Sequence, residues 1–213
     1  MSPTEKSRAS NSKRRTRIQR ENEGRILEAA LETFSSNGFR GTTIDQIADA
    51  AGMSKPNVLY YFRNKEDMHR VLLDQLLDTW LDPLRAIDAE GDPLNEILKY
   101  VQRKLEISHN HPRESRLFAN EILQGAPRID DVIKGPLKDL VDEKSVTIKG
   151  WVDAGKIADC DPRHLIFSIW STTQHYADFD VQICAVLGEK YASNRFDAAS
   201  EFLGKLFTNG LRV

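Results

Sequence analysis

Apolar residues recur at intervals of three and four positions along most of this chain, which is the spacing that places them on one face of an α-helix. The first such segment begins near Glu21 and stops at Asn37-Gly38, two residues that tolerate the left-handed conformation of a helix end. Two short segments with the same periodicity follow over residues 43–51 and 54–62, with Gly52 between them. The pattern therefore predicts three helices in the first part of the chain.

The same periodicity continues to the C-terminus. Aspartate–proline pairs such as Asp92-Pro93 and Asp161-Pro162 predict helix starts, because aspartate caps the free N–H groups and proline fits the first turn. No convincing alternation of the kind found in β-strands is present. Further helices are expected over residues 65–82, 93–108, 117–123, 132–152 (interrupted at Gly135-Pro136), 162–177 and 196–207. The sequence thus predicts an all-α fold of about nine helices.

Charge is distributed unevenly, although the net charge is only -2. Residues 1–20 carry seven Lys and Arg side chains against the single acid Glu5, whereas the region after residue 70 is acidic. Such a basic arm lowers its free energy beside phosphates because condensed counterions are released. We expect residues 1–20 to be a disordered arm that contacts DNA through Arg14, Arg15 and Arg17, with a merely solubilising tail as the alternative.

The two short helices with glycine between them have the organisation of a helix-turn-helix, in which the second helix enters the major groove. Residues 54–62 would then be the recognition helix. Helix–glycine–helix segments occur in many all-α proteins, but the adjacent basic arm and two tyrosines on the outer face favour DNA binding. The residues expected to contact DNA in this region are Thr43, Ser54, Lys55, Asn57, Tyr60, Tyr61 and Lys65.

Other classes of protein find little support. The chain lacks the GxSxG, GxGxxG, Walker-type and HExxH motifs, so no enzyme is expected. The sequence contains no run of 18 apolar residues that could span a membrane, so a soluble cytoplasmic protein is expected. Cys160 and Cys184 have no CxxC spacing, and His109, His111 and His164 have no carboxylate or cysteine partner at firm ligand spacing. We therefore expect neither a metal nor a cofactor.

At the level of motifs, the segments 42–48, 51–55 and 59–66 resemble the signature of TetR-type repressors, and the similarity covers about residues 20–68. This resemblance implies a homodimer that grips a palindromic operator and releases it when a small molecule binds the C-terminal domain. Leu59 and Pro56 depart from the tyrosine and glycine of many members, so no phosphate contact is carried over to Leu59. The predicted domains are a DNA-binding domain over residues 21–66 and a helical effector-binding and dimerisation domain over 67–213.

A second resemblance extends through the body of the chain to about residue 180. The segments 104–106, 115–118, 125–127, 142–145, 150–152, 164–170 and 173–179 are similar to the Rut-type regulators of pyrimidine utilisation. The similarity implies uracil, thymine or a related pyrimidine as effector, and control of pyrimidine metabolism genes. The alternatives are a TetR-type regulator of a different small molecule and a helical adaptor that binds protein.

The residues themselves offer a matching chemistry. Trp170, Thr173 and Gln174 share one helical face, and the Gln174 amide has the donor and the acceptor that an imide edge requires. Trp80 or Trp170 could stack on a flat ring, while Arg116 and Lys104 could meet carbonyl oxygens. The alternatives are that this face is core or dimer interface, that the cations form surface salt bridges, and that His175 and Tyr176 lie between subunits.

Overall fold

The computed structural model describes residues 3–213, with side chains from residue 17 onward. Every regular element in this described part is helical, which confirms the all-α prediction. Contacts divide the chain into two compact units, Met1–Leu73 and Asp74–Val213, a division close to the predicted boundary at residue 66. None of the described helices combines the length and the apolar character that crossing a membrane requires.

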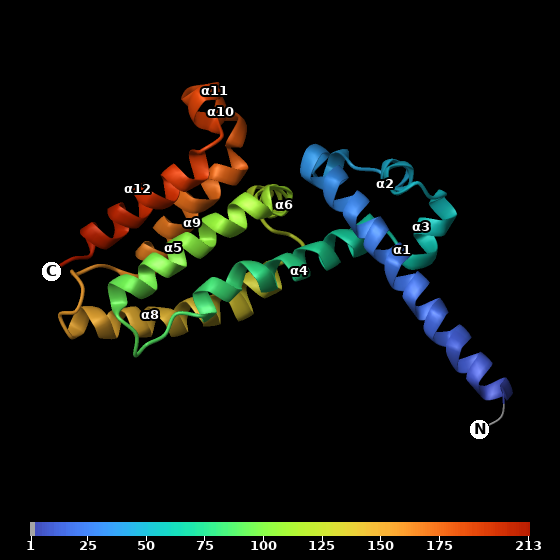
Figure 1. Cartoon of the computed structure of the whole chain (residues 1–213), viewed down its shortest axis with the longest axis horizontal. Helices are drawn as coiled ribbons and strands as arrows, with labels where there is room; N and C mark the ends of the chain where they lie inside the picture. The colour runs from blue at the N-terminus through green and yellow to red at the C-terminus, as the bar shows by residue number, and fades with distance from the viewer. Residues whose placement is uncertain (1–2) are drawn as a thin grey trace. The chain divides into compact units, whose positions relative to one another are not determined.

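The first unit contains α1 (Pro3–Gly41), α2 (Ile44–Ala51), α3 (Lys55–Tyr61) and the beginning of α4 (Lys65–Arg85) (Figure 1). Its core is built from the apolar positions that the periodicity identified, and these side chains are fully or almost fully buried: Ile26, Ala30, Phe34, Ile47, Ala48, Val58 and Met68. The expected end of the first helix is a kink at Gly38, whose φ of 67° is accessible to glycine at no steric cost.

The start of α1 differs from the expectation of an irregular arm over residues 1–20. Helical backbone begins at Pro3, because no glycine or proline interrupts the chain between Thr4 and Glu23 and proline is tolerated in the first turn. Apolar periodicity begins only near Glu21, so it could not reveal this polar extension. The side chains of residues 1–16, including Arg14 and Arg15, lie outside the described residues.

The second unit contains the remainder of α4 and the helices that follow it. Asp92 and Asp161 accept backbone N–H groups at the starts of α5 and α9, which confirms both predicted caps. The segment η1 coincides with the predicted interruption at Gly135-Pro136, whereas α7, α10 and α11 were not predicted. The bounds are α5 Pro93–Asn110, α6 Pro112–Leu123, α7 Asp130–Val132, η1 Ile133–Leu137, α8 Lys138–Asp153, α9 Pro162–Asp178, α10 Asp180–Leu187, α11 Glu189–Ala192 and α12 Arg195–Gly210.

Helix α5 packs against both α9 and α12 and so lies at the centre of this unit. Its buried residues Ile97 and Val101 meet Ile166 and Ile169 of α9 and Leu203 of α12 in one core. Helix α9 also packs against α6 and α8, so a side chain on its inner face can approach three other helices.

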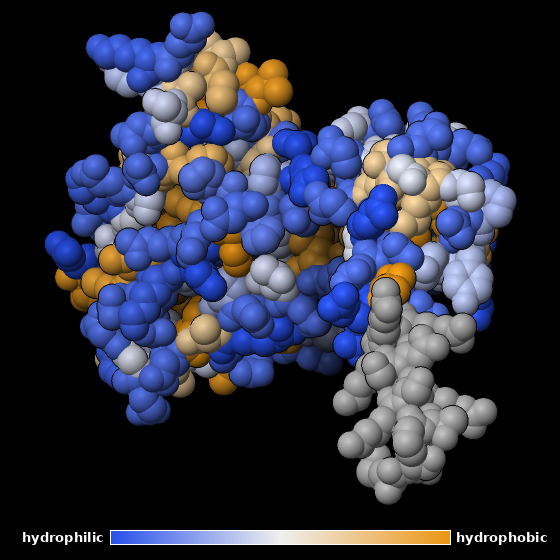
Figure 2. All heavy atoms as spheres, turned by 45° about the vertical axis from the view of Figure 1, so that its right-hand side comes forward, coloured by the Kyte–Doolittle hydropathy of each residue, from blue (hydrophilic) through white to orange (hydrophobic). Residues whose placement is uncertain are grey.

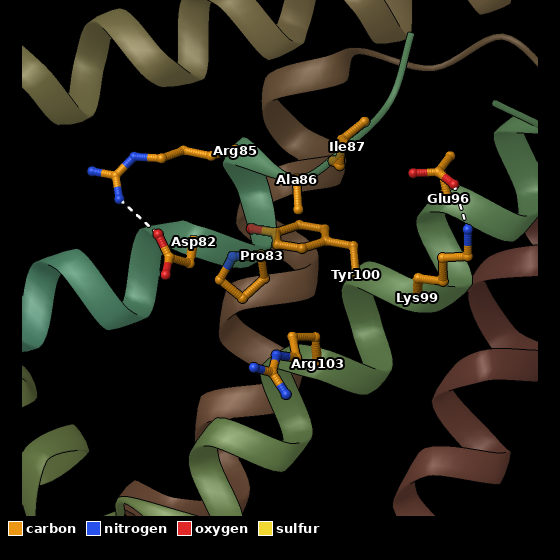
Figure 3. A pocket seen from close by; sticks show the side chains of 9 residues that line it. All are labelled: Asp82, Pro83, Arg85, Ala86, Ile87, Glu96, Lys99, Tyr100 and Arg103. Carbon is orange, nitrogen blue, oxygen red and sulfur yellow. Dashed lines mark hydrogen bonds and ion pairs between the residues drawn. The ribbon is translucent and has the colours of Figure 1, made fainter. Parts of the chain in front are cut away.

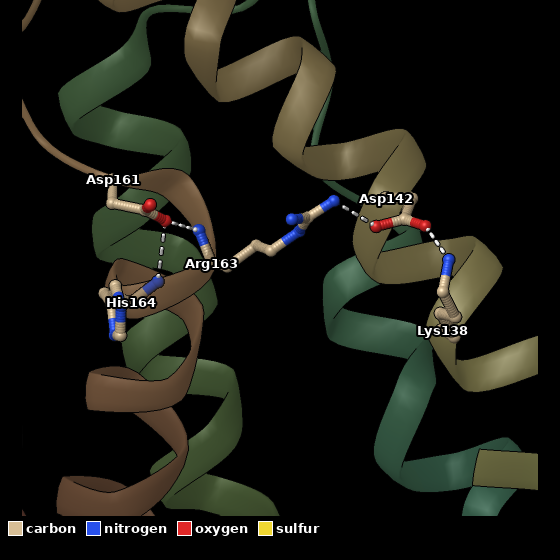
Figure 4. A network of polar contacts seen from close by, with 5 residues as sticks. All are labelled: Lys138, Asp142, Asp161, Arg163 and His164. Atoms are coloured by element: carbon tan, nitrogen blue, oxygen red, sulfur yellow. Dashed lines mark hydrogen bonds and ion pairs between the residues drawn. The ribbon is translucent and has the colours of Figure 1, made fainter. Parts of the chain in front are cut away.

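Ion pairs on the surface fasten α8 to the start of α9. The Arg163 guanidinium lies 2.8 Å from Asp142, which also accepts from Lys138, and Asp161 caps the helix beside them (Figure 4). The Lys138 and Arg163 hydrogen bonds hold the pKa of Asp142 below its ordinary value. Because these side chains are largely exposed, solvent screens the pairs, and we expect them to add little to the stability of the fold.

Candidate functional site

The α2–α3 segment has the local structure of a helix-turn-helix. The Thr43 hydroxyl accepts from the N–H of Gln46, whose side chain accepts from the N–H of Thr43, so a capping box starts α2. Gly52, with a φ of 63°, ends it, and the Ser54 hydroxyl accepts from the N–H of Asn57 at the start of α3. The predicted turn is therefore present, and Thr43 and Ser54 define its two helix starts.

The outer face of α3 is polar and open. Val58 is buried against the unit's core, while Lys55, Asn57 and Tyr60 are exposed, Tyr60 to 73% of its surface. An aromatic side chain left this open by the fold offers its ring and hydroxyl to a partner. The structure thus exposes three of the side chains that the sequence placed in a DNA groove.

Tyr61 lies on the flank of this face and is half-buried. Its hydroxyl accepts a hydrogen bond of 2.9 Å from the Asn22 amide of α1, and its ring meets Tyr60 edge-on with centroids 5.2 Å apart. Lys55 is also held, because its ammonium lies 2.9 Å from the Asp45 carboxylate of α2. The candidate DNA-contacting side chains are therefore oriented by contacts within the unit.

Lys65, which is predicted to contact DNA, also makes contacts within the protein. Its ammonium donates to the carbonyls of Phe39 and Thr42, both at 2.8 Å, and lies 4.4 Å from the centroid of the Phe39 ring. The side chain thereby ties the start of α4 to the α1–α2 turn. Contact between Lys65 and a DNA backbone stays a prediction, as does contact by Arg17, which is exposed and lies 3.3 Å from Glu21.

In the second unit, two predicted effector residues meet in the interior. The Lys104 ammonium lies 5.2 Å from the centroid of the Trp80 ring, and the lysine is only 2% exposed. Burial lowers the pKa of Lys104 to about 7, while the negative charge of Asp178 acts in the opposite direction. The Trp80 indole N–H and the Ser108 hydroxyl are buried and have no hydrogen-bond partner among the described residues. Both donors could therefore bond an acceptor that a ligand supplies.

Asp178 is the carboxylate of this buried polar cluster, which we define as Trp80, Lys104, Ser108, Ser115 and Asp178. The Ser115 hydroxyl donates to Asp178 at 2.5 Å. Burial raises the pKa of Asp178, whereas Ser115 and the positive charges of Arg116 and Lys104 oppose that shift. The cluster brings together side chains of α4, α5, α6 and α9.

A pocket of about 420 Å³ opens beside Asp178 and contains two further predicted effector residues, Gln174 and Arg116. Its walls are mostly apolar, with a few polar groups, as in many small-molecule sites. The lining residues are Arg116, Phe118, Ala119, Asn120, Ile122, Leu123, Gln174, Asp178 and Phe179. The structure therefore groups Gln174 and Arg116 around Asp178, and Trp80 and Lys104 in the adjoining cluster.

Thr173 and Trp170 have partners within the protein. The Thr173 hydroxyl, fully buried, donates to the Ile169 carbonyl at 2.6 Å. The Trp170 indole donates to the Tyr100 hydroxyl at 2.6 Å, and burial raises the pKa of Tyr100. Both residues are packed in the core, which is one of the alternatives considered for this helical face. Their contact with an effector stays a prediction.

A second pocket of about 600 Å³ lies where α4 ends and α5 begins (Figure 3). The Tyr100 ring lies between Pro83 and Ala86 in this view. The cations at the rim have partners, since Arg85 lies 3.0 Å from Asp82 and Lys99 lies 2.8 Å from Glu96. Because carboxylates already neutralise these cations, the pocket is poorly suited to binding an anion.

Sequence reasoning missed Asp178, Ser108 and Ser115. Asp178 lies eight positions after Trp170 and so continues the face of α9 that was identified, and Ser108 lies four positions after Lys104 on α5. Ser115 had no comparable signal, because only the packing of α6 on α9 brings it to Asp178. No group of three or more potential metal ligands occurs among the side chains of residues 17–213.

Two family models match the chain, and together they cover most of it. Residues 26–71 match the bacterial regulatory proteins of the tetR family, and residues 73–213 match the C-terminal region of YcdC-like proteins. The first match contains the helix-turn-helix, and the second contains the buried polar cluster and both pockets.

Named relatives and solved structures agree with these matches. The HTH-type transcriptional regulator RutR of Escherichia coli K12 is 49% identical over 188 residues, which are 88% of this chain and 89% of that protein. The structure of the ketosteroid transcriptional regulator KstR2 of Mycobacterium tuberculosis has a TM-score of 0.67 at 21% identity, covering 90% of this chain and 95% of the other. AibR in complex with isovaleryl coenzyme A and operator DNA has a TM-score of 0.57 at 19% identity, covering 73% and 85%.

Proposed function

Because the chain belongs to the TetR family of transcriptional regulators, we propose that it binds a palindromic operator as a homodimer and leaves it when a pyrimidine such as uracil or thymine binds the second unit. In this role it acts as a repressor of pyrimidine metabolism genes. The observation that carries the DNA-binding part is the exposed polar face of α3, held in place by two capped helix starts.

The α3 face suits the major groove. Asn57 has the donor and acceptor that can read an adenine edge, and Lys55 can donate to a guanine edge or a phosphate. Tyr60, largely exposed, adds a hydroxyl and a flat ring. The basic residues of the N-terminal arm would strengthen binding without sequence preference, because their contribution comes from phosphates.

Dimerisation is supported by apolar side chains left open on the second unit. Phe167 of α9 and Phe202 and Leu206 of α12 are 45%, 61% and 50% exposed. A space-filling view shows a further apolar patch at its top, where Figure 1 places α10 and α11 (Figure 2). Two copies that cover such surfaces would present two α3 helices to successive major grooves about one helical turn apart.

The effector part of the proposal is supported by the cluster and by the similarity to RutR. Trp80 offers an indole N–H and a flat ring, Lys104 offers a buried amine, and Gln174 offers a primary amide at the pocket. A pyrimidine dione carries two carbonyl acceptors and ring N–H donors, which match these groups in kind.

Coupling between effector and operator would use α4, since this single helix carries both Lys65 and Trp80. Lys65 ties α4 to the α1–α2 turn, and Trp80 belongs to the buried polar cluster. A ligand that favours one position of α4 over another shifts the population of DNA-binding dimers by its difference in affinity for the two states.

A selection experiment tests the whole proposal. Duplexes enriched from a random pool by the protein should share a palindrome, and anisotropy with that duplex should show binding that uracil or thymine weakens. Indifference to every duplex at low salt would refute DNA binding. Tight, uracil-insensitive binding would refute the effector and leave a regulator of another small molecule.

A further inference from the structure

Lys104 is buried without the partner that a buried ammonium requires. Only 2% of its surface is exposed, and no described side chain forms an ion pair with it. The nearest compensating group is the face of the Trp80 ring, with the ring centroid 5.2 Å from the ammonium nitrogen. A cation removed from water and left with so little compensation loses its proton readily.

The other charged groups around Lys104 do not replace such a partner. The negative charge of Asp178 of α9 favours the charged form of Lys104. The same carboxylate, however, accepts a hydrogen bond from Ser115 and also interacts electrostatically with Arg116 of α6 and His175 of α9. Helix α4 contributes only the uncharged Trp80, and Ser108 of α5 is uncharged as well. The Lys104 amine is therefore balanced between its neutral and charged forms near pH 7.

Two donors of the same cluster are unsatisfied. The Trp80 N–H and the Ser108 hydroxyl, both buried, have no hydrogen-bond partner among the described residues. A ligand that places a carbonyl oxygen here would satisfy such donors, and the same oxygen would favour the charged form of a nearby amine.

We propose that effector binding draws one proton from solvent onto the Lys104 amine, so that the buried polar cluster responds to pH as well as to the pyrimidine. The inference rests on the proposed function and adds regulation to it. The proton binds the lone pair of Nζ, and the resulting ammonium donates to an effector carbonyl oxygen. No covalent bond to the effector forms or breaks.

The coupling has a definite sign. Below about pH 7 the free protein already carries the proton, so effector affinity is maximal and nearly constant. Above it, binding must include protonation, and affinity falls as pH rises. If the bound amine remains protonated, the affinity at pH 8 should be about tenfold lower than at pH 6. A regulator of this kind would respond more weakly to its effector in alkaline conditions.

Calorimetric titration with uracil tests the inference on the whole protein. At pH 6, 7 and 8, each in phosphate and in imidazole buffer, the difference in apparent enthalpy between buffers reports the protons taken up. We expect uptake near zero at pH 6 and approaching one proton per site at pH 8, with the stated loss of affinity. This measurement on the natural protein does not depend on a variant that folds.

Variants identify the group. Lys104→Met should abolish both proton uptake and the pH dependence of affinity, whereas Lys144→Met should retain them, because Lys144 is a buried lysine that already donates to the Ile87 carbonyl. His175→Gln should also retain the proton uptake and the pH dependence of affinity, and this result would exclude the His175 imidazole as the group that takes up the proton. Uracil binding with the same affinity and enthalpy in every buffer would overturn the inference and leave the proposed function intact. Absence of uracil binding at all three pH values would overturn both.

Discussion

The side-chain amide of Asn22 donates a hydrogen bond of 2.9 Å to the hydroxyl of Tyr61, joining α1 to the end of α3 across 39 positions of sequence. Tyr61 in turn meets the ring of Tyr60 edge-on. A residue of α1 therefore helps to fix the two tyrosines on the face that we assign to DNA, although it lies far from them in sequence.

Removing this hydrogen bond should loosen the recognition helix. We expect Asn22→Ala to lower the free energy of unfolding by about 0.5–1.5 kcal/mol and to weaken operator binding, because Tyr61 loses its anchor. Chemical denaturation and anisotropy would measure the two effects. Gln19→Ala, on the exposed side of α1, is the matched control. Equal operator affinity in both variants would show that the bond plays no part in recognition.

Tyr60 is the side chain whose loss should affect DNA and little else. Since it is 73% exposed, Tyr60→Ala should leave thermal stability nearly unchanged while weakening operator binding by about 1–3 kcal/mol. A gel shift measures the affinity, and size-exclusion chromatography checks that assembly is unaltered. Undiminished affinity would count against α3 as the recognition helix.

The basic arm should act through phosphates alone. Removing residues 1–18 should reduce affinity for operator and unrelated duplexes alike, and each lost phosphate contact should make the salt slope shallower by about 0.9. Binding measured over a series of salt concentrations gives this slope. A truncated protein with an unchanged slope would dismiss the arm as a binding element.

Gln174 should decide effector recognition at the pocket. Gln174→Leu removes the amide and keeps a side chain of similar size, so uracil binding should be lost while operator binding persists. Calorimetry and anisotropy measure the two properties. Gln102→Leu, an exposed glutamine of α5, serves as control and should bind uracil normally. A responsive Gln174→Leu variant would remove this residue from the site.

Lys104 should make the free energy of unfolding of the effector-free protein depend on pH. Its pKa is about 7 in the fold against 10.5 as an ordinary lysine, so unfolding takes up a proton between these values. The free energy of unfolding should therefore rise with pH across that window, by up to about 1.4 kcal/mol per pH unit, relative to Lys104→Met. Urea denaturation at pH 7, 8 and 9 measures the difference. Parallel curves for the two proteins would contradict the lowered pKa.

Much of the fold could be predicted because the information is local. Apolar spacing gave the main helices, Asp92 and Asp161 gave helix starts, and Gly38 and Gly52 gave the breaks. The polar start of α1 was missed, because a solvated helix needs no apolar stripe. The exposure of Lys55, Asn57 and Tyr60 was also predictable, since a short helix with Val58 facing inward turns those positions outward.

Local sequence signals specify the helices, the helix-turn-helix and the outward face of α3, because caps and periodicity act over a few residues. Three pairs of residues could be recognised only from the packed helices: Lys104 over the Trp80 ring, Ser115 hydrogen-bonded to Asp178, and Trp170 hydrogen-bonded to Tyr100. These pairs come from different helices, and their meeting depends on how α4, α5, α6 and α9 pack. The pKa of Lys104 depends on that packing as well, because burial and neighbouring charges set it rather than the identity of the residue.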